Sequence, residues 1–270
     1  MEMKYWEHEK ENFIEVLTFD RPPINAINTE AVIELKEALV EFENNKEIKV
    51  LILAGKADHA FIAHADLIEI NDLINIGNTD KINNTIKIWH DAFSMVETIS
   101  KPVIAAIHGL TLGGGTELCL ACDLRVMAED SHIGCPEVMA GLIPLAGGTQ
   151  RLPMLIGASK AKELILTGKI ISSAEAVKLG LVTKVASRSD LLKDAKELAK
   201  HISNVAAPLA VRAAKRAINR GLQEPDLRKS LAIETESAST LLNTEDLKEG
   251  VKALIEHRCY VSTWLSLASI

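Results

Sequence analysis

The chain has 270 residues, of which 47% are hydrophobic, 25% charged and 4% aromatic, and its formal net charge is −7. This composition is typical of a folded globular protein and excludes disordered, collagen-like and low-complexity classes. The acidic balance disfavours binding to duplex nucleic acid, which requires a basic face, but it does not exclude small anionic ligands. Residues 1–13 are too charged for a signal peptide, and the longest uncharged apolar stretch, 138–148, is shorter than the ~18 residues of a membrane helix. We therefore expect a cytoplasmic protein.

Strand-like and helix-like patterns alternate through the first two thirds of the chain. Short apolar or alternating runs predict strands at residues 13–19, 49–54, 102–107, 123–128 and 181–185. Helical patterns occupy residues 28–42, 80–99 and 113–121, with Asn28 as an expected N-cap and Val32, Ile33, Leu35, Leu39, Val40 and Phe42 as an expected apolar stripe. Such alternation predicts a parallel sheet with right-handed crossovers.

The last third of the chain is mainly helical. A capping box at Ser172–Glu175 opens one of these helices. The stretch from Ala206 to His257 has no strand partner. We expect it to pack on the core or on another subunit.

The run Gly113-Gly114-Gly115 stands between an expected buried strand and an expected helix. Glycines at this place allow close approach of the backbone to a ligand, and they leave the first N–H groups of the helix unpaired. Such a site suits a phosphate or an oxyanion, although a tight turn with close strand–helix packing explains the same pattern. The run matches neither the G-x-x-x-x-G-K-[ST] nor the G-x-G-x-x-G nucleotide loop.

Two glutamates are candidates for acid–base chemistry. Glu117 lies on the first turn of the helix that follows the glycine run, and Glu137 follows a proline in an apolar segment. A partly desolvated carboxyl has a raised pKa, which suits a general acid or base. A surface glutamate in a loop is the alternative interpretation of Glu137.

Cysteine and histidine provide weaker indications. Cys119, Cys122, His132 and Cys135 form a set of the right size for zinc, but two of them lie inside an apolar helix, where a free cysteine is usually a small core residue. The histidines 59, 64, 90, 108 and 132 are scattered, and no nucleophile motif accompanies them. Only His64 is retained as a candidate.

Five segments in order resemble the enoyl-CoA hydratase/isomerase (crotonase) superfamily over essentially the whole chain. They are RPPINAIN at 21–28, FIAHADL at 61–67, IHGLTLGGGTE at 107–117, GCPE at 134–137 and PLAGGTQRL at 144–152. The resemblance implies an α/β fold with a spiral of ββα units at 1–205 and a helical trimerisation region at 206–270. It also implies a homotrimer or homohexamer.

The same resemblance implies an acyl-CoA substrate and assigns roles by position. The backbone N–H groups of Ala65 and Gly114 would form an oxyanion hole for the thioester oxygen. Glu117 would deprotonate a water and Glu137 would protonate Cα, which together hydrate a 2-enoyl-CoA. No metal ion or redox cofactor is implied, since coenzyme A is part of the substrate. Further implied substrate contacts are Ala26, Ala63, His64, Leu67, Gly113, Leu145 and Arg258.

The chain departs from the family pattern at three places. His64 replaces a usual glycine, which costs about 1 kcal/mol if the position needs a positive φ, unless the imidazole instead contacts the substrate. Leu145 would narrow the acyl pocket or displace a backbone donor. Leu254 and His257 replace an aromatic residue and a lysine that help hold the nucleotide of CoA, while Arg258 could still meet a phosphate.

Several activities remain open on this fold. Two glutamates favour hydration, because an isomerase can work with the carboxylate equivalent to Glu137 alone. The alternatives are enoyl-CoA isomerisation, hydration of a cyclic dienoyl-CoA, acyl-CoA hydrolysis and a non-catalytic RNA-binding scaffold, which the acidic composition disfavours. The sequence does not give the acyl chain length and does not separate a trimer from a hexamer.

Overall fold

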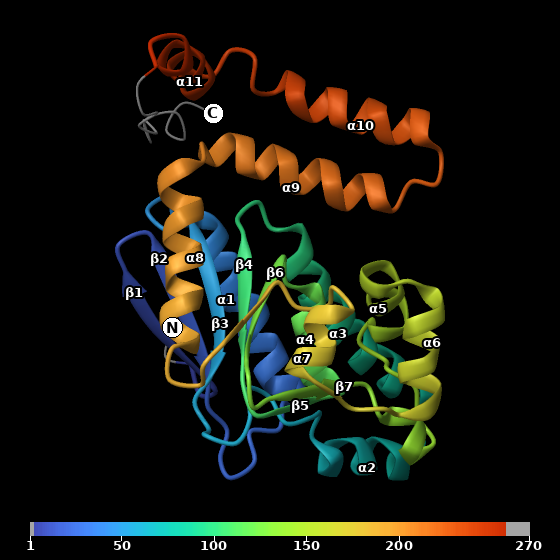
Figure 1. Cartoon of the computed structure of the whole chain (residues 1–270). Coiled ribbons are helices and arrows are strands. Elements are labelled where there is room, and N and C mark those ends of the chain that lie inside the picture. Colours follow the sequence, from blue (N-terminus) through green and yellow to red (C-terminus); the bar gives the residue numbers. More distant parts are fainter. Residues whose placement is uncertain (1–2, 258–270) are drawn as a thin grey trace.

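The computed structural model describes residues 3–257 and contains a six-stranded sheet with the order β1-β2-β3-β4-β6-β9 (Figure 1). The strands are β1 (Trp6–Glu11), β2 (Ile14–Phe19), β3 (Val50–Gly55), β4 (Val103–Ile107), β6 (Leu124–Ala128) and β9 (Lys184–Ala186). Strand β1 pairs antiparallel with β2, and the other neighbouring pairs are parallel. The predicted parallel sheet is confirmed, and β1 adds an edge strand that was not expected.

The helices of the described residues follow the expected alternation. They are α1 (Thr29–Asn44), α2 (Leu67–Ile76), α3 (Thr79–Thr98), α4 (Gly114–Ala121), α5 (Gly148–Ile156), α6 (Ala158–Thr167), α7 (Ser173–Lys178), α8 (Leu191–Val205), α9 (Pro208–Leu222), α10 (Leu227–Ser239) and α11 (Glu245–Ile255). None of them is long and apolar enough to cross a membrane.

Apolar side chains cover both faces of the main sheet. Ile52 and Ile104 pack on one face against Ala195 of α8. Leu53 on the other face belongs to the larger core, together with Phe93 of α3 and residues of α1. Two covered faces explain why the central strands are near-continuous apolar runs.

A smaller sheet positions the segments on which the candidate acid–base residues lie. Its strands are β5 (Leu110–Leu112), β7 (His132–Gly134) and β8 (Ile171–Ser172), in the order β5-β7-β8. Strand β5 leads directly into α4, and β7 leads into the short 3-10 helix η1 (Glu137–Ala140). The two parallel strands therefore deliver both chain segments to the same end of the small sheet.

The local predictions were correct with specific exceptions. Asn28 caps α1 by accepting a hydrogen bond from Ala31 N at 3.0 Å, as expected. Ile33 and Val40 are 42% and 45% exposed, so the buried stripe of α1 is narrower than predicted. The capping box at the start of α7 is present as predicted.

The C-terminal helices attach to the core through α9, and α10 packs along α9 (Figure 1). Buried Lys215 of α9 donates to the carboxylate of Asp123 at 2.7 Å and to the carbonyl oxygen of Lys101 at 2.9 Å. The expected packing on the core is therefore confirmed for α9. The domain division at residue 206 stays a prediction.

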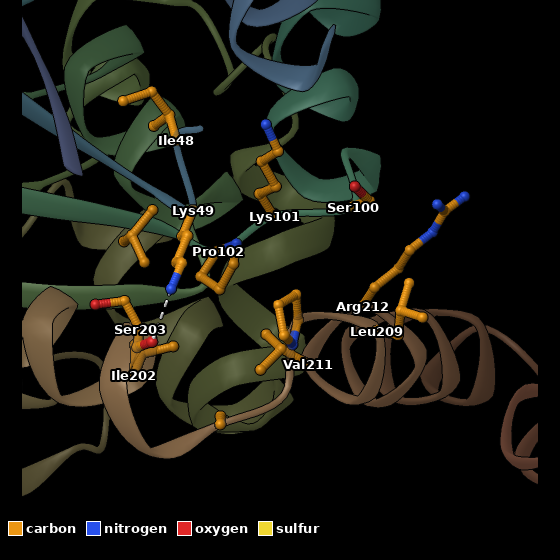
Figure 2. Close-up of a pocket in the computed structure, with 13 residues that line it drawn as sticks. Ile48, Lys49, Ser100, Lys101, Pro102, Ile202, Ser203, Leu209, Val211 and Arg212 are labelled. Atoms are coloured by element: carbon orange, nitrogen blue, oxygen red, sulfur yellow. Dashed lines mark hydrogen bonds between the residues drawn. The ribbon is translucent and has the colours of Figure 1, made fainter. Parts of the chain in front are cut away.

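A small cavity of about 50 Å³ lies where α8 passes into α9 (Figure 2). Lys49 reaches along it and donates to the carbonyl oxygen of Ser203 at 3.2 Å. Burial lowers the pKa of Lys49 to about 8. Lys101 donates to the carbonyl oxygens of Phe42 and Asn45, at 2.5 Å each. Both lysines therefore hold backbone segments together.

Candidate active site

A cavity of about 350 Å³ opens beside the glycine run. Its walls come from α2, α3, the first turn of α4, and the chain between Pro136 and Ala146. Apolar side chains such as Ile70, Ile82 and Trp89 form most of the lining. A mostly apolar pocket with a few convergent polar groups is the usual form of a small-molecule site.

Glu117 is the most deeply buried carboxyl of this cavity, and its residue is 3% exposed. Its Oε1 accepts hydrogen bonds from Ala146 N at 2.7 Å and from Gly148 N at 2.8 Å. Burial raises the pKa of Glu117 to about 7, against the opposing effect of the two N–H donors. A carboxyl with this pKa exchanges protons readily near neutral pH.

Glu137 stands at the start of η1 on the same cavity. Burial raises its pKa above the ordinary value. Its Oε2 is buried, and no group among residues 3–257 forms a hydrogen bond with it. A side chain at Gly113 would crowd this carboxyl, because an added Cβ would lie 3.1 Å from Glu137 Oε1. The glycine therefore keeps open the space in which the carboxyl sits.

The two carboxyls influence each other across the cavity. Both carboxyls line the cavity, and the negative charge of Glu137 raises the pKa of Glu117 further. Because two like charges in a poorly solvated pocket repel, the pair favours a state that holds one proton. Such a pair can supply one proton donor and one proton acceptor.

Two backbone N–H groups open onto the cavity beside these carboxyls. Ala65 precedes the N-cap of α2, and Gly114 is the first residue of α4. Within residues 3–257, no hydrogen-bond acceptor pairs with either N–H. The two backbones approach closely, because a Cβ on Gly114 would lie 3.5 Å from Ala65 Cβ and 2.8 Å from Trp89 Cζ3. Unpaired N–H groups at a helix start can bind a developing negative charge.

His64 lines the cavity next to Ala65. Its Nδ1 lies 2.7 Å from the carbonyl oxygen of Ala65 and must carry hydrogen, because a carbonyl oxygen can only accept. The φ angle of His64 is not positive, so the condition under which histidine would strain the backbone here is not met. Histidine fits here because the backbone has an ordinary conformation.

The other predicted substrate-binding residues fall into three groups. Leu67, Gly113 and Leu145 line the cavity. Ala26 and Ala63 are buried, at 2% and 7% exposure, and do not line it, so their roles stay predictions. Arg258 lies outside the described residues.

The cysteine set does not form a metal centre. Cys119, Cys122 and Cys135 are buried as free thiols. Across the described part of the chain, no three His, Cys, Asp or Glu side chains cluster in a way that could hold a metal ion. Cysteine in this core packs as a small apolar side chain.

Arg151 supports the segment that binds Glu117, and its role was not predicted. Its Nη1 donates to the carbonyl oxygen of Ala146 at 3.0 Å, and its Nη2 lies 3.1 Å from the Glu97 carboxylate. The residue was part of the PLAGGTQRL segment, but only the three-dimensional fold brings α3 next to that segment.

Comparisons with known proteins agree with this geometry. The profile of the Enoyl-CoA hydratase/isomerase family matches residues 9–262. A short-chain-enoyl-CoA hydratase of Clostridium acetobutylicum is 40% identical over 252 residues, which is 93% of this chain and 94% of that protein. A crotonyl-CoA hydratase of Syntrophomonas wolfei is 37% identical over 251 residues, covering 93% and 94%.

A solved structure extends the similarity to three dimensions. The crystal structure of an enoyl-CoA hydratase from Bacillus anthracis matches with a TM-score of 0.89 at 37% identity, and the match covers 96% of this chain and 99% of that chain. The expected crotonase fold is thereby confirmed. The chain belongs to the enoyl-CoA hydratase/isomerase family.

Proposed function

We propose that this protein is an enoyl-CoA hydratase that adds water across the C2–C3 double bond of a short 2-enoyl-CoA thioester. Relatives at 40% and 37% identity are a short-chain-enoyl-CoA hydratase and a crotonyl-CoA hydratase. Within the chain itself, the observation that supports hydration is the pair Glu117 and Glu137, which line one cavity and interact electrostatically.

The thioester oxygen binds, in this proposal, between the N–H groups of Ala65 and Gly114. Both residues line the cavity, and their N–H groups lack other acceptors among the described residues. Electron density moves onto this oxygen as water attacks C3, so the two donors stabilise the transition state more than the bound substrate. Removing one donor of this kind typically lowers the rate by about 10²–10³-fold.

The two carboxyls then divide the proton chemistry. The oxygen of water forms a bond to C3 while Glu117 takes one of its protons. The electron pair of the double bond moves toward the thioester oxygen and returns to bind, at C2, the proton that Glu137 releases. Proton exchange between the carboxyls through solvent restores the starting state. The pKa of Glu117, about 7, lets it take up and release a proton near neutral pH.

Replacing each glutamate by glutamine tests these roles. Since general acid–base catalysis contributes about 10²–10⁴-fold, we expect Glu117→Gln and Glu137→Gln each to lower kcat by roughly 10³-fold while acyl-CoA still binds. Glu163→Gln is the control, because this exposed side chain of α6 pairs with Lys160 on the surface. Wild-type kcat in either active-site variant, measured on crotonyl-CoA, would contradict the assignment.

Assembly, location and cofactor use complete the proposal. We propose a homotrimer or homohexamer, since the C-terminal helices leave Leu222, Leu227 and Ile255 exposed by 68%, 71% and 72%. Light scattering should give a mass of three or six chains, and a monomer would contradict this. We also propose a cytoplasmic enzyme that needs no metal or redox cofactor. Cell fractionation tests the location, and activity measured after exhaustive chelation tests whether a metal is needed.

A further inference from the structure

We propose that His90 of α3 is a positioning residue that fixes the orientation of the Leu145–Ala146 peptide and thereby holds the Ala146 N–H on Glu117. This inference rests on the proposed role of Glu117 in hydration. The sequence alone gave no reason to separate His90 from the other scattered histidines. Its importance appears only through the loop that it contacts.

One peptide unit connects His90 to Glu117. The Nε2 of His90 lies 2.5 Å from the carbonyl oxygen of Leu145 and carries the hydrogen, because the carbonyl can only accept. The N–H of the same peptide belongs to Ala146 and donates to Glu117 Oε1 at 2.7 Å. A trans peptide is planar, and its C=O and N–H point in opposite directions. Fixing the carbonyl therefore fixes the direction of the N–H.

The carbonyl of Ala146, the next in the loop, is linked to α3 through the side chain of Arg151. Arg151 donates to the Ala146 carbonyl at 3.0 Å and is held in turn by Ser94 and Glu97 of α3. His90, Ser94 and Glu97 are four and three residues apart in sequence, so they lie on one face of the helix. Among the described residues, His90 is the only side chain that binds the Leu145 carbonyl.

Losing the His90 donor would free this peptide to rotate. The Ala146 N–H would then move away from Glu117, and its donation lowers the pKa of that carboxyl. The pKa of Glu117 would rise above about 7, so a smaller fraction would be ionised at neutral pH. The other groups that face Glu117 (the Gly148 N–H and the charges of Glu137 and Arg151) remain in place.

The experiment compares two replacements of His90 with a matched control. Glutamine carries an amide N–H at about the reach of Nε2, whereas leucine keeps side-chain bulk without a donor. His90 is exposed, so neither replacement disturbs the core. His201→Leu removes an exposed histidine from α8, away from the cavity. Thermal melting verifies that all variants are folded.

Two readouts are measured, and one of them does not depend on activity. The infrared carboxyl band that disappears in Glu117→Gln reports the titration of Glu117 directly. The second readout is the pH dependence of kcat and KM on crotonyl-CoA. We expect His90→Leu to move the infrared midpoint and the rising limb of kcat upward by roughly one pH unit, and to lower kcat about fivefold at pH 7 with little change in KM.

We expect His90→Gln to restore the wild-type midpoint and kcat to within about threefold, and His201→Leu to change neither. A wild-type midpoint in His90→Leu would overturn the inference, and so would a glutamine variant as impaired as the leucine variant. If the wild-type protein does not hydrate enoyl-CoA, the proposed function fails, while the infrared titration still decides the role of His90.

Discussion

A single added methyl group at Gly148 tests the local geometry of Glu117. In Gly148→Ala, the new Cβ would lie 2.8 Å from Pro144 Cβ, 3.0 Å from Glu117 Oε1 and 3.2 Å from Glu117 Cγ. The φ angle of Gly148 is not positive, so the backbone itself accepts alanine. The effect of the substitution therefore comes from crowding of Pro144 and of the Glu117 carboxyl rather than from backbone strain.

The magnitude follows from the hydrogen bond that this crowding breaks. Ordinary carbon contacts are about 3.5–4.0 Å, so the carboxyl of Glu117 must move by several tenths of an ångström. This movement takes it away from the Gly148 N–H, which in the wild-type structure donates to Glu117 Oε1 at 2.8 Å. A hydrogen bond to a charged group contributes about 1.5–3 kcal/mol. We therefore expect kcat/KM to fall by roughly 10–100-fold, and the pKa of Glu117 to rise because its carboxylate loses a donor.

The assay is the pH profile of kcat/KM on crotonyl-CoA for Gly148→Ala, with Gly221→Ala as the control. An added Cβ at Gly221 of α9 meets its nearest neighbour, Ser230 Cβ, at 4.0 Å, which is ordinary contact. We expect the control to keep the wild-type profile. A Gly148→Ala variant with wild-type kcat/KM and an unshifted rising limb would refute the view that this N–H controls Glu117.

Three further predictions concern specificity and stability. We expect His64→Gly to lower kcat/KM about tenfold and to broaden selectivity across a panel of acyl-CoAs, because the imidazole lines the cavity; unchanged kinetics would remove any role for it. The pKa of Lys49 in the folded state, about 8, is below its ordinary value of 10.5. Between these two pH values the unfolded state binds more protons than the folded state. The unfolding free energy of the wild-type protein should therefore rise with pH in this window relative to that of Lys49→Met. If the unfolding free energies of the two proteins changed with pH in parallel, this prediction would be contradicted. Lys215→Met leaves the Asp123 carboxylate, whose side chain is 20% exposed, with the Val103 N–H but without its cationic partner, and it should lower the unfolding free energy by about 3 kcal/mol in a denaturant titration. Lys248→Met removes an exposed pair and should change the unfolding free energy by less than about 0.5 kcal/mol.

The central strands and the two carboxyls of the cavity were predictable because each has a strong local signal. The strand at residues 50–55 is a continuous apolar run covered on both faces. Glu117 and Glu137 were located through the glycine run and the resemblance of five ordered segments to one family. Sequence spacing also correctly placed Glu117 on the first turn of its helix.

Strand β1 and helix α2 were missed for physical reasons that the structure makes clear. Strand β1 is an edge strand in which only Trp6 is buried, so its charged residues do not resemble a core strand. Helix α2 buries no side chain, because its apolar residues line the cavity or face solvent. The sequence does contain one local signal for α2, since Asp66 caps it by accepting from the N–H groups of Ile68 and Glu69.

The supporting residues of the site could not be predicted from local patterns. His90 and Arg151 act through backbone carbonyls of a loop that lies 55 and 5 residues away in sequence. Such contacts depend on how α3 packs beside the loop, and no periodicity or motif encodes that arrangement. The absence of strain at His64 likewise follows from a φ angle that only the fold determines.

Isotopic labelling during a single turnover tests the central claim most directly. Purified protein is given crotonyl-CoA in a mixture of heavy-oxygen water and deuterium oxide, and the product is analysed by mass spectrometry. Hydration of the C2–C3 double bond predicts a 3-hydroxyacyl-CoA with one solvent oxygen at C3 and one solvent hydrogen at C2. A product that gains solvent hydrogen without solvent oxygen, or a free acid with the oxygen in its carboxyl group, would contradict hydration.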